Sequence, residues 1–126
     1  MKKILVIDDH PIMHRELEKM LTARGYKFIG AFDVMSGLRK AKHELPHLIL
    51  VDIMLPEIDG LQVVRSLKTD PEIKDIPIIF MSVKFSSKGQ QKEETVKVDD
   101  SLYPAFGKPL DYSKLLSVIQ ELINKK

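Results

Sequence analysis

Near the N-terminus the sequence reads Lys3-Ile4-Leu5-Val6-Ile7-Asp8-Asp9, a short apolar run that ends in two carboxylates. Two further runs have the same character, His47–Val51 and Pro77–Met81. Continuous apolar runs of about 4 to 8 residues, bounded by polar or turn residues, are typical of parallel strands that helices cover on both faces. We therefore predict that the three runs are buried strands of one parallel sheet.

Segments with helical spacing of their apolar residues separate the predicted strands. They are Met13–Leu21, Val34–Ala41, Leu61–Leu67 and Leu115–Ile123. Tyr26–Ala31 and Tyr103–Gly107 supply two further strands, and the polar segment Ser86–Val98 is expected to hold a short helix. Strand and helix then alternate five times, which predicts a doubly wound α/β fold. We expect a five-stranded parallel sheet of order 2-1-3-4-5 with helices on both faces, as in flavodoxin-like proteins.

The composition limits the possible classes of protein. At about 150 residues per domain, the 126 residues correspond to one domain, 1–126. The formal net charge is only +2 and the basic residues are spread along the chain, so we expect no direct nucleic-acid binding. The apolar runs are far shorter than the roughly 18 residues of a membrane span, and the first is too short for a signal peptide. We expect a cytoplasmic protein without a membrane partner.

Charged and polar residues follow four of the predicted strands. They are Asp8 and Asp9, Asp52, Ser82, and Lys108 before Pro109. Ligand sites of open α/β sheets lie at the carboxyl ends of the strands, so we expect these side chains to converge on one pocket. Three carboxylates and one ammonium leave two negative charges uncompensated, which a divalent cation would balance. Because the sequence has no cysteine and offers hard oxygen ligands here, we predict Mg²⁺.

Each of these residues also has a plainer explanation. A single Asp at a strand end is usually a helix cap or a solvated loop residue, and Ser82 alone is a typical turn residue. Lys108 could simply end a strand, with Pro109 near the start of the last helix. Five such residues at four strand ends are hard to obtain as independent caps, so we favour a functional set.

Four segments carry a more specific pattern: Val6–Pro11, Leu50–Gly60, Ile78–Ser82 and Lys108-Pro109. In this order they resemble the receiver domain of bacterial two-component response regulators, and the resemblance covers nearly the whole chain. It implies a phosphoacceptor signalling switch, that is, a regulatory domain that assists its own phosphorylation and dephosphorylation without being a turnover enzyme. The implied partners are a histidine kinase or phosphotransfer protein and a downstream protein target.

The resemblance also implies a role for each residue of the set. Asp52 would accept a phosphoryl group from a phosphohistidine of the kinase. Asp9 and Asp52 would bind Mg²⁺ directly, Asp8 would act through water, and the backbone carbonyl of Met54 would add a ligand. Ser82 and Lys108 would hold the phosphoryl oxygens. Phosphorylation would then draw the ends of the last two strands inward and change the contacts that the domain makes with its partners.

The chain departs from the family pattern near its C-terminal half. Val83 stands where the family usually has Ala or Gly, and the segment from Ser82 to Lys108 is longer than expected, with the extra residues predicted around Ser101–Pro104. Ala105 occupies the position of the usual switch aromatic. Tyr103 and Phe106 are the alternatives, and for both we favour packing against the sheet.

For three further features we favour a structural interpretation over a functional one. We read His10 as a loop residue at the pocket rim in preference to a metal ligand. The spacing of Lys84, Lys88 and Lys92 would form one basic edge, which we interpret as a solvated face. Asp59 before Gly60 is typical of a helix cap.

Three functional hypotheses remain open at this point. The first is the phosphoacceptor switch, and the second is a receiver-like interaction module that is not phosphorylated in use. The third is a Mg²⁺ phosphohydrolase with an aspartyl nucleophile, which is disfavoured because Met54 stands where such enzymes commonly place a second carboxylate. Nucleotide binding is disfavoured because the loop after the first strand is acidic where a phosphate cradle needs glycines.

Overall fold

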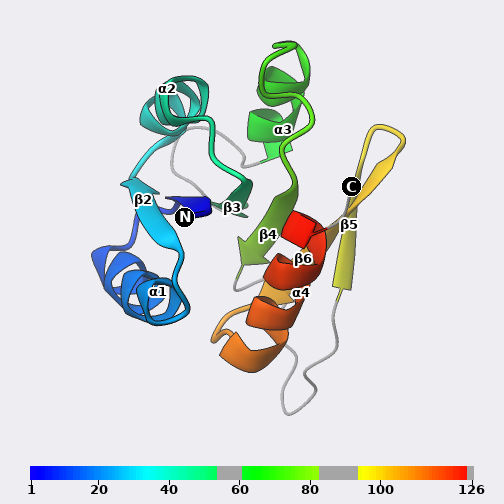
Figure 1. Ribbon diagram of the computed structural model, residues 1–126. Helices are drawn as coiled ribbons and strands as arrows, with labels where there is room; N and C mark the ends of the chain where they lie inside the picture. The colour runs from blue at the N-terminus through cyan, green and yellow to red at the C-terminus, as the bar shows by residue number, and fades with distance from the viewer. Residues whose placement is uncertain (54–60, 83–93, 125–126) are drawn as a thin grey trace.

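The apolar runs of the sequence form adjacent strands at the centre of a sheet (Figure 1). The computed structural model describes residues 1–53, 61–82 and 94–124. The elements in chain order are β1 (Lys3–Ile7), α1 (Pro11–Ala23), β2 (Lys27–Ala31), α2 (Val34–Glu44), β3 (Leu48–Asp52), α3 (Leu61–Lys68), β4 (Ile78–Ser82), β5 (Glu94–Val98), β6 (Ser101–Gly107) and α4 (Tyr112–Asn124). In the described part of the chain, no helix is long and apolar enough to cross a membrane.

The sheet has the order β2-β1-β3-β4-β6-β5. Its first five strands pair in parallel and correspond to the predicted order 2-1-3-4-5, so the predicted α/β class and its winding are confirmed. The strand count was wrong: β5 adds a sixth strand, antiparallel to β6. The predicted helix within Ser86–Val98 is therefore wrong for residues 94–98, and its remaining residues lie outside the described ranges.

Local sequence explains why residues 94–98 form a strand. Thr95, Val96 and Val98 are β-branched, and such residues favour the pleated backbone. Exposure alternates along the strand, since Thr95 and Lys97 are exposed whereas Val98 is buried. Asp99 and Asp100 then connect β5 to β6, and Asp99 has the positive φ of 55° that Asp tolerates better than most residues.

The extra residues that we expected around Ser101–Pro104 lie in the first half of β6. This half pairs with β5 alone, because β4 pairs with β6 only from Ala105 to Gly107. The longer connection is thus used to build an additional hairpin at the edge of the sheet, which Figure 1 shows projecting beyond β4.

Alternate residues of each central strand face opposite sides of the sheet, and two cores result. Leu5, Val51 and Phe80 belong to the core under α2 and α3. Val6, Leu50 and Met81 belong to the core under α1 and α4. Figure 1 shows the two helix pairs on the two faces of the sheet. Because both faces are covered, the central strands β1, β3 and β4 are largely apolar, and Asp8, Asp52 and Ser82 lie at their carboxyl ends.

Gly37 on α2 offers a test of this packing next to β1, the strand that Asp8 follows. A Cβ at position 37 would collide with Cδ1 of Ile7 and lie 2.8 Å from its Cγ1. Gly37→Ala would gain about 1 kcal/mol in helix propensity, but overpacking of a close-packed core costs about 1–3 kcal/mol. We expect a net loss of stability on chemical unfolding.

Ile7→Val removes the nearest atom and should relieve part of that loss. In the double variant the two losses should fall short of additivity by at least about 0.5 kcal/mol. Full additivity would show that the glycine is not needed for this close approach.

Candidate functional site

The parallel strands bring the predicted site residues to one edge of the sheet. Asp52 ends β3, Ser82 ends β4, and Asp8 directly follows β1. All three are at least 98% buried, with relative exposures of 0% for Asp8, 2% for Asp52 and 0% for Ser82. Lys108 follows β6, and its backbone N–H donates a hydrogen bond to the Ser82 carbonyl at 3.1 Å. The predicted convergence of the strand ends is therefore present.

Lys108 provides the ammonium of the site. Its Nζ donates to Asp8 Oδ2 at 2.8 Å and to Asp52 Oδ2 at 3.1 Å, and its side chain is only 13% exposed. Burial disfavours the charged ammonium, but the hydrogen bonds and charges of Asp8 and Asp52 outweigh that effect and raise the pKa of Lys108. Lys108 therefore stays charged and bridges two buried carboxylates.

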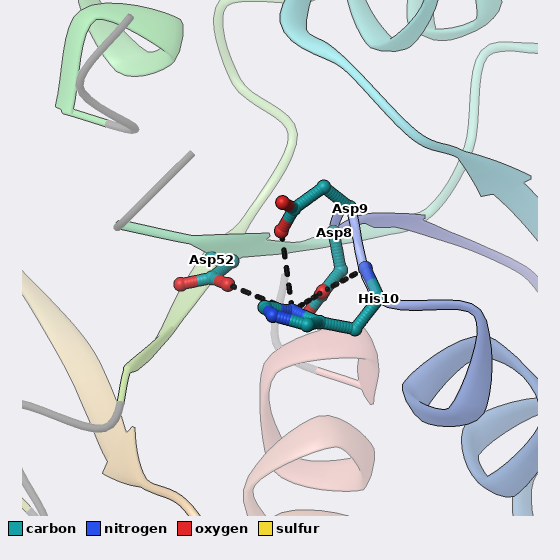
Figure 2. A group of neighbouring side chains, drawn as sticks. All are labelled: Asp8, Asp9, His10 and Asp52. Carbon is teal, nitrogen blue, oxygen red and sulfur yellow. Dashed lines mark hydrogen bonds and ion pairs between the residues drawn. The ribbon is translucent and has the colours of Figure 1, made fainter. Parts of the chain in front are cut away.

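His10 is an exposed residue whose ring contacts the carboxylates of the site. Its side chain is 62% exposed, yet Nδ1 lies 2.9 Å from Asp8 Oδ1, 3.1 Å from Asp9 Oδ1 and 3.9 Å from Asp52 Oδ2. Figure 2 shows the ring between the three acidic side chains. The sequence places His10 beside the acidic pair but does not show how closely its ring approaches the carboxylates. The local backbone sets this approach, because the His10 N–H donates to Asp8 Oδ1 at 2.8 Å.

The cluster has the composition and size of a metal site. One ligand atom from each of Asp8, Asp9, His10 and Asp52 can be chosen so that all four lie within 4.8 Å of one another. Asp9 Oδ1 is buried and accepts no hydrogen bond from the described residues. Buried carboxylate oxygens usually have a partner, so the arrangement fits a bound cation, and oxygen-rich ligands fit Mg²⁺. The predicted ligand Met54 lies outside the described ranges.

His14 of α1 holds the backbone of Asp8 in place. The sequence alone does not identify this residue. Its Nε2 donates to the Asp8 carbonyl at 2.7 Å, and its ring stacks on Phe32 with centroids 4.1 Å apart. A Cβ at Gly30 would lie 2.7 Å from His14 Nδ1, so the glycine leaves room for this ring. Its place three residues before the apolar Leu17 was the available signal, because that spacing puts His14 on the inward face of α1.

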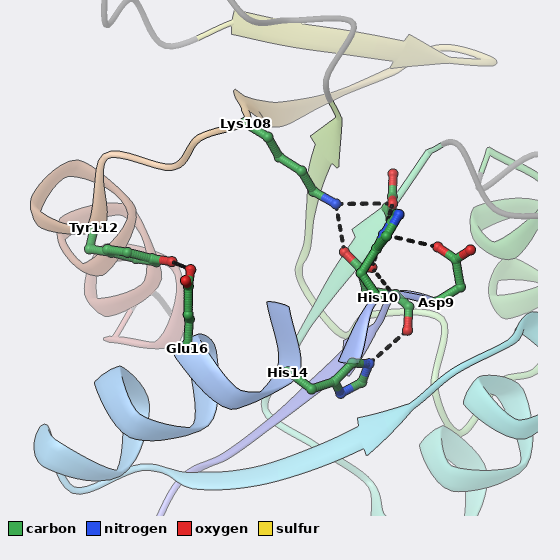
Figure 3. Close-up of polar contacts among 8 residues, drawn as sticks. Asp9, His10, His14, Glu16, Lys108 and Tyr112 are labelled. Atoms are coloured by element: carbon green, nitrogen blue, oxygen red, sulfur yellow. Dashed lines mark hydrogen bonds and ion pairs between the residues drawn. The ribbon is translucent and has the colours of Figure 1, made fainter. Parts of the chain in front are cut away.

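A second polar contact joins the helices beside the site (Figure 3). The Tyr112 hydroxyl of α4 donates to Glu16 Oε1 of α1 at 2.7 Å. Burial, followed by the hydrogen bond and the charge of Glu16, raises the pKa of Tyr112 to about 12. The contact ties α4 to α1 on the face of the sheet that they share.

The two candidate switch aromatics lie on opposite faces of the sheet. Tyr103 meets Phe80 edge to face at 5.8 Å and packs against the core under α2 and α3. Phe106 is buried in the core under α1 and α4. Both therefore pack against the sheet as expected. The remaining residues of interest, Val83, Lys84, Lys88, Lys92 and Asp59, lie outside the described ranges.

A doubly wound sheet with an acidic cluster and a lysine at its carboxyl edge is the arrangement that the receiver resemblance implies. The comparison with known families agrees, because the family described as response regulator receiver domain matches residues 4–120. The chain belongs to this family, whose members are regulatory domains of two-component signalling.

Individual proteins support the assignment. The protein PilH of Pseudomonas aeruginosa is 32% identical over 126 residues, covering 98% of this chain and 98% of PilH. The response regulator PleD of Caulobacter vibrioides is 41% identical over 80 residues, which are 64% of this chain but only 18% of PleD. Among solved structures, the receiver domain of a sensor histidine kinase from Pseudomonas aeruginosa has a TM-score of 0.79 at 24% identity, covering 98% of each chain. That structure has a magnesium ion coordinated in its active site cleft.

Proposed function

We propose that the chain is a phosphoacceptor switch in which Asp52 accepts a phosphoryl group with the help of Mg²⁺. The observation that carries this proposal is the environment of Asp52. Its carboxylate is buried, shares the Lys108 ammonium with Asp8, and lies within the acidic cluster. A buried carboxylate beside fixed positive charge is a competent nucleophile for an incoming phosphoryl group.

The proposed transfer exchanges one N–P bond for one O–P bond. An Asp52 carboxylate oxygen attacks phosphorus of a phosphohistidine, an O–P bond forms, and the N–P bond to the imidazole of the partner breaks. Mg²⁺, when bound by Asp8, Asp9 and Asp52, would neutralise charge on the transferred group. Lys108 and Ser82 would hold the phosphoryl oxygens. The same residues would assist the later loss of the phosphoryl group to water, so the domain is regulatory and not a turnover enzyme.

The contacts of Lys108 suggest how the signal would be passed on. Its ammonium is held by Asp8 and Asp52, and a phosphoryl group on Asp52 would give it new acceptor oxygens. Because the Lys108 N–H is bonded to the Ser82 carbonyl, a movement of Lys108 would displace the ends of both β4 and β6. We infer a shift between two states that changes the surface around β6 and α4.

The proposed partners follow from this chemistry. The donor would be a histidine kinase or a phosphotransfer protein, and the receiver of the signal would be a downstream protein that reads the altered surface. The alternative, a receiver-like module that is not phosphorylated in use, is favoured by one observation. The β5–β6 hairpin gives the side of the sheet beyond β4 a different structure from the predicted one.

Intact-mass spectrometry tests the proposal. The chain is incubated with acetyl phosphate, with Mg²⁺ or with EDTA, and we expect the mass of one added phosphoryl group only with Mg²⁺. Mg²⁺ binding is measured on the same sample by calorimetry. Binding without any phosphoryl gain, from acetyl phosphate or from a set of purified histidine kinases, would favour the interaction module and overturn the switch.

A further inference from the structure

His10 Nδ1 lies among the carboxylates of Asp8, Asp9 and Asp52. The nitrogen lies 2.9, 3.1 and 3.9 Å from one oxygen each of Asp8, Asp9 and Asp52. In an octahedral site with metal–ligand bonds of about 2.1 Å, neighbouring ligands lie about 3 Å apart and opposite ligands about 4 Å apart. The three distances are therefore those expected between ligands of one metal ion.

Hydrogen bonding accounts for only one of these contacts. A ring nitrogen carries at most one proton, and Nδ1 is within hydrogen-bond distance of Asp8 Oδ1. Asp9 Oδ1 lies 3.1 Å from the same nitrogen, is buried, and accepts no hydrogen bond from the described part of the chain. A cation among these atoms would satisfy the carboxylate oxygens and the nitrogen together.

The backbone holds the His10 ring at this place. His10 is the N-cap residue of α1, with φ −98° and ψ 114°, and Pro11 after it favours such an extended conformation. The His10 N–H is bonded to the Asp8 carboxylate, which fixes the residue next to its neighbour. Since the side chain is 62% exposed, a proton on Nε2 can face water while Nδ1 presents its lone pair to a metal.

We propose that His10 Nδ1 is a direct ligand of the divalent ion and that it makes the site favour ions that accept imidazole, such as Ni²⁺ and Co²⁺, relative to Mg²⁺. The inference rests on the metal site of the proposed function and adds a nitrogen ligand to its oxygen set. Imidazole binds Ni²⁺ and similar transition metals well, whereas Mg²⁺ takes oxygen ligands almost exclusively. His10 would thus determine the metal preference of the site.

Calorimetric titration of the metal-free chain with Ni²⁺ alone and with Mg²⁺ alone tests this. The variants are His10→Ala, His10→Gln, which offers an amide oxygen instead, and the control His43→Ala at an exposed position on α2. We expect His10→Ala to bind Ni²⁺ at least roughly tenfold more weakly than the native chain. Loss of a residue that only supports a metal ligand already costs about this much affinity. The Mg²⁺ affinity of His10→Ala should change little. In both variants the ratio of Ni²⁺ to Mg²⁺ affinity should therefore be lower than in the native chain.

A second readout does not depend on any variant. Proton NMR of the native chain with Co²⁺ should show a strongly shifted ring C–H signal from a coordinated imidazole, because carbon-bound protons do not exchange with water. Absence of that signal, or an unchanged ratio of Ni²⁺ to Mg²⁺ affinity in His10→Ala, would overturn the assignment of His10. A gain in Mg²⁺ affinity at an unchanged ratio would show that the ring only competes with the ion.

Different results would overturn the proposed function and the proposed role of His10. If the native chain bound neither Mg²⁺ nor Ni²⁺, both the metal site and the Mg²⁺-assisted switch would be overturned. If Mg²⁺-dependent phosphorylation were observed with an unchanged affinity ratio in His10→Ala, only the role of His10 would be lost.

Discussion

Asp52→Asn is expected to abolish phosphorylation by acetyl phosphate in the presence of Mg²⁺. The amide has nearly the shape of the carboxylate but is not a competent nucleophile, so no acyl phosphate can form at this position. Removal of a covalent nucleophile typically costs several powers of ten in rate, and we expect a decrease of at least about 100-fold. Intact-mass spectrometry of the native chain and the variant, at equal donor and Mg²⁺ concentrations, measures the effect.

Asp75→Asn is the matched control for this variant. Asp75 is exposed and lies shortly before β4 begins, so it belongs to the opposite edge of the sheet from the site. The Asp75→Asn variant should be phosphorylated to the same extent as the native chain. Thermal unfolding should show that Asp52→Asn is folded, because Lys108 keeps its contact with Asp8. Persistent phosphorylation of a folded Asp52→Asn would contradict the proposed acceptor.

Lys108→Met is expected to be the most destabilising single change at the site when metal is absent. It leaves the carboxylates of Asp8 and Asp52 buried, with side-chain exposures of 0% and 3%, without their shared ammonium. Breaking a buried ion pair by removing one partner costs about 3–5 kcal/mol. Because the folded-state pKa of Lys108 is raised above its ordinary value, the native ammonium contributes its full stabilisation below about pH 10.4 and loses it only as the pH rises through that folded pKa.

Urea unfolding at neutral pH in EDTA measures this loss, and Lys42→Met provides the control. Lys42 pairs with Asp70 at 3.1 Å but is 62% exposed, so its removal should cost less than about 1 kcal/mol. Added Mg²⁺ should restore part of the stability of Lys108→Met, because a ligand of the folded state stabilises it. Similar losses in the two variants, or no recovery with Mg²⁺, would contradict the described electrostatics.

The position of the site could be predicted because topology determines it. Once β1, β3 and β4 are parallel neighbours, the residues that end or follow them, Asp8, Asp52 and Ser82, must lie at one edge. The sequence also carries the apolar runs that make these strands buried on both faces. These features are set by the order of the elements and not by local detail.

The features that were missed depend on local backbone or on pairing between distant segments. The alternation of strands and helices along the chain suggested a short helix in the polar segment before Asp99. The β-branched residues Thr95, Val96 and Val98 and the pairing with β6 make residues 94–98 a strand. The reach of His10 into the acidic cluster depends on its bond to the Asp8 carboxylate. The role of His14 depends on the room that Gly30 leaves beside it.

The most direct test of the proposed switch locates the phosphoryl group on the chain. The phosphorylated protein is treated with borohydride, which reduces an aspartyl phosphate to homoserine with release of phosphate, and the peptides are sequenced by tandem mass spectrometry. We expect homoserine at position 52 only in samples that received both acetyl phosphate and Mg²⁺. Homoserine at another aspartate, such as Asp8 or Asp9, with residue 52 unchanged would contradict it.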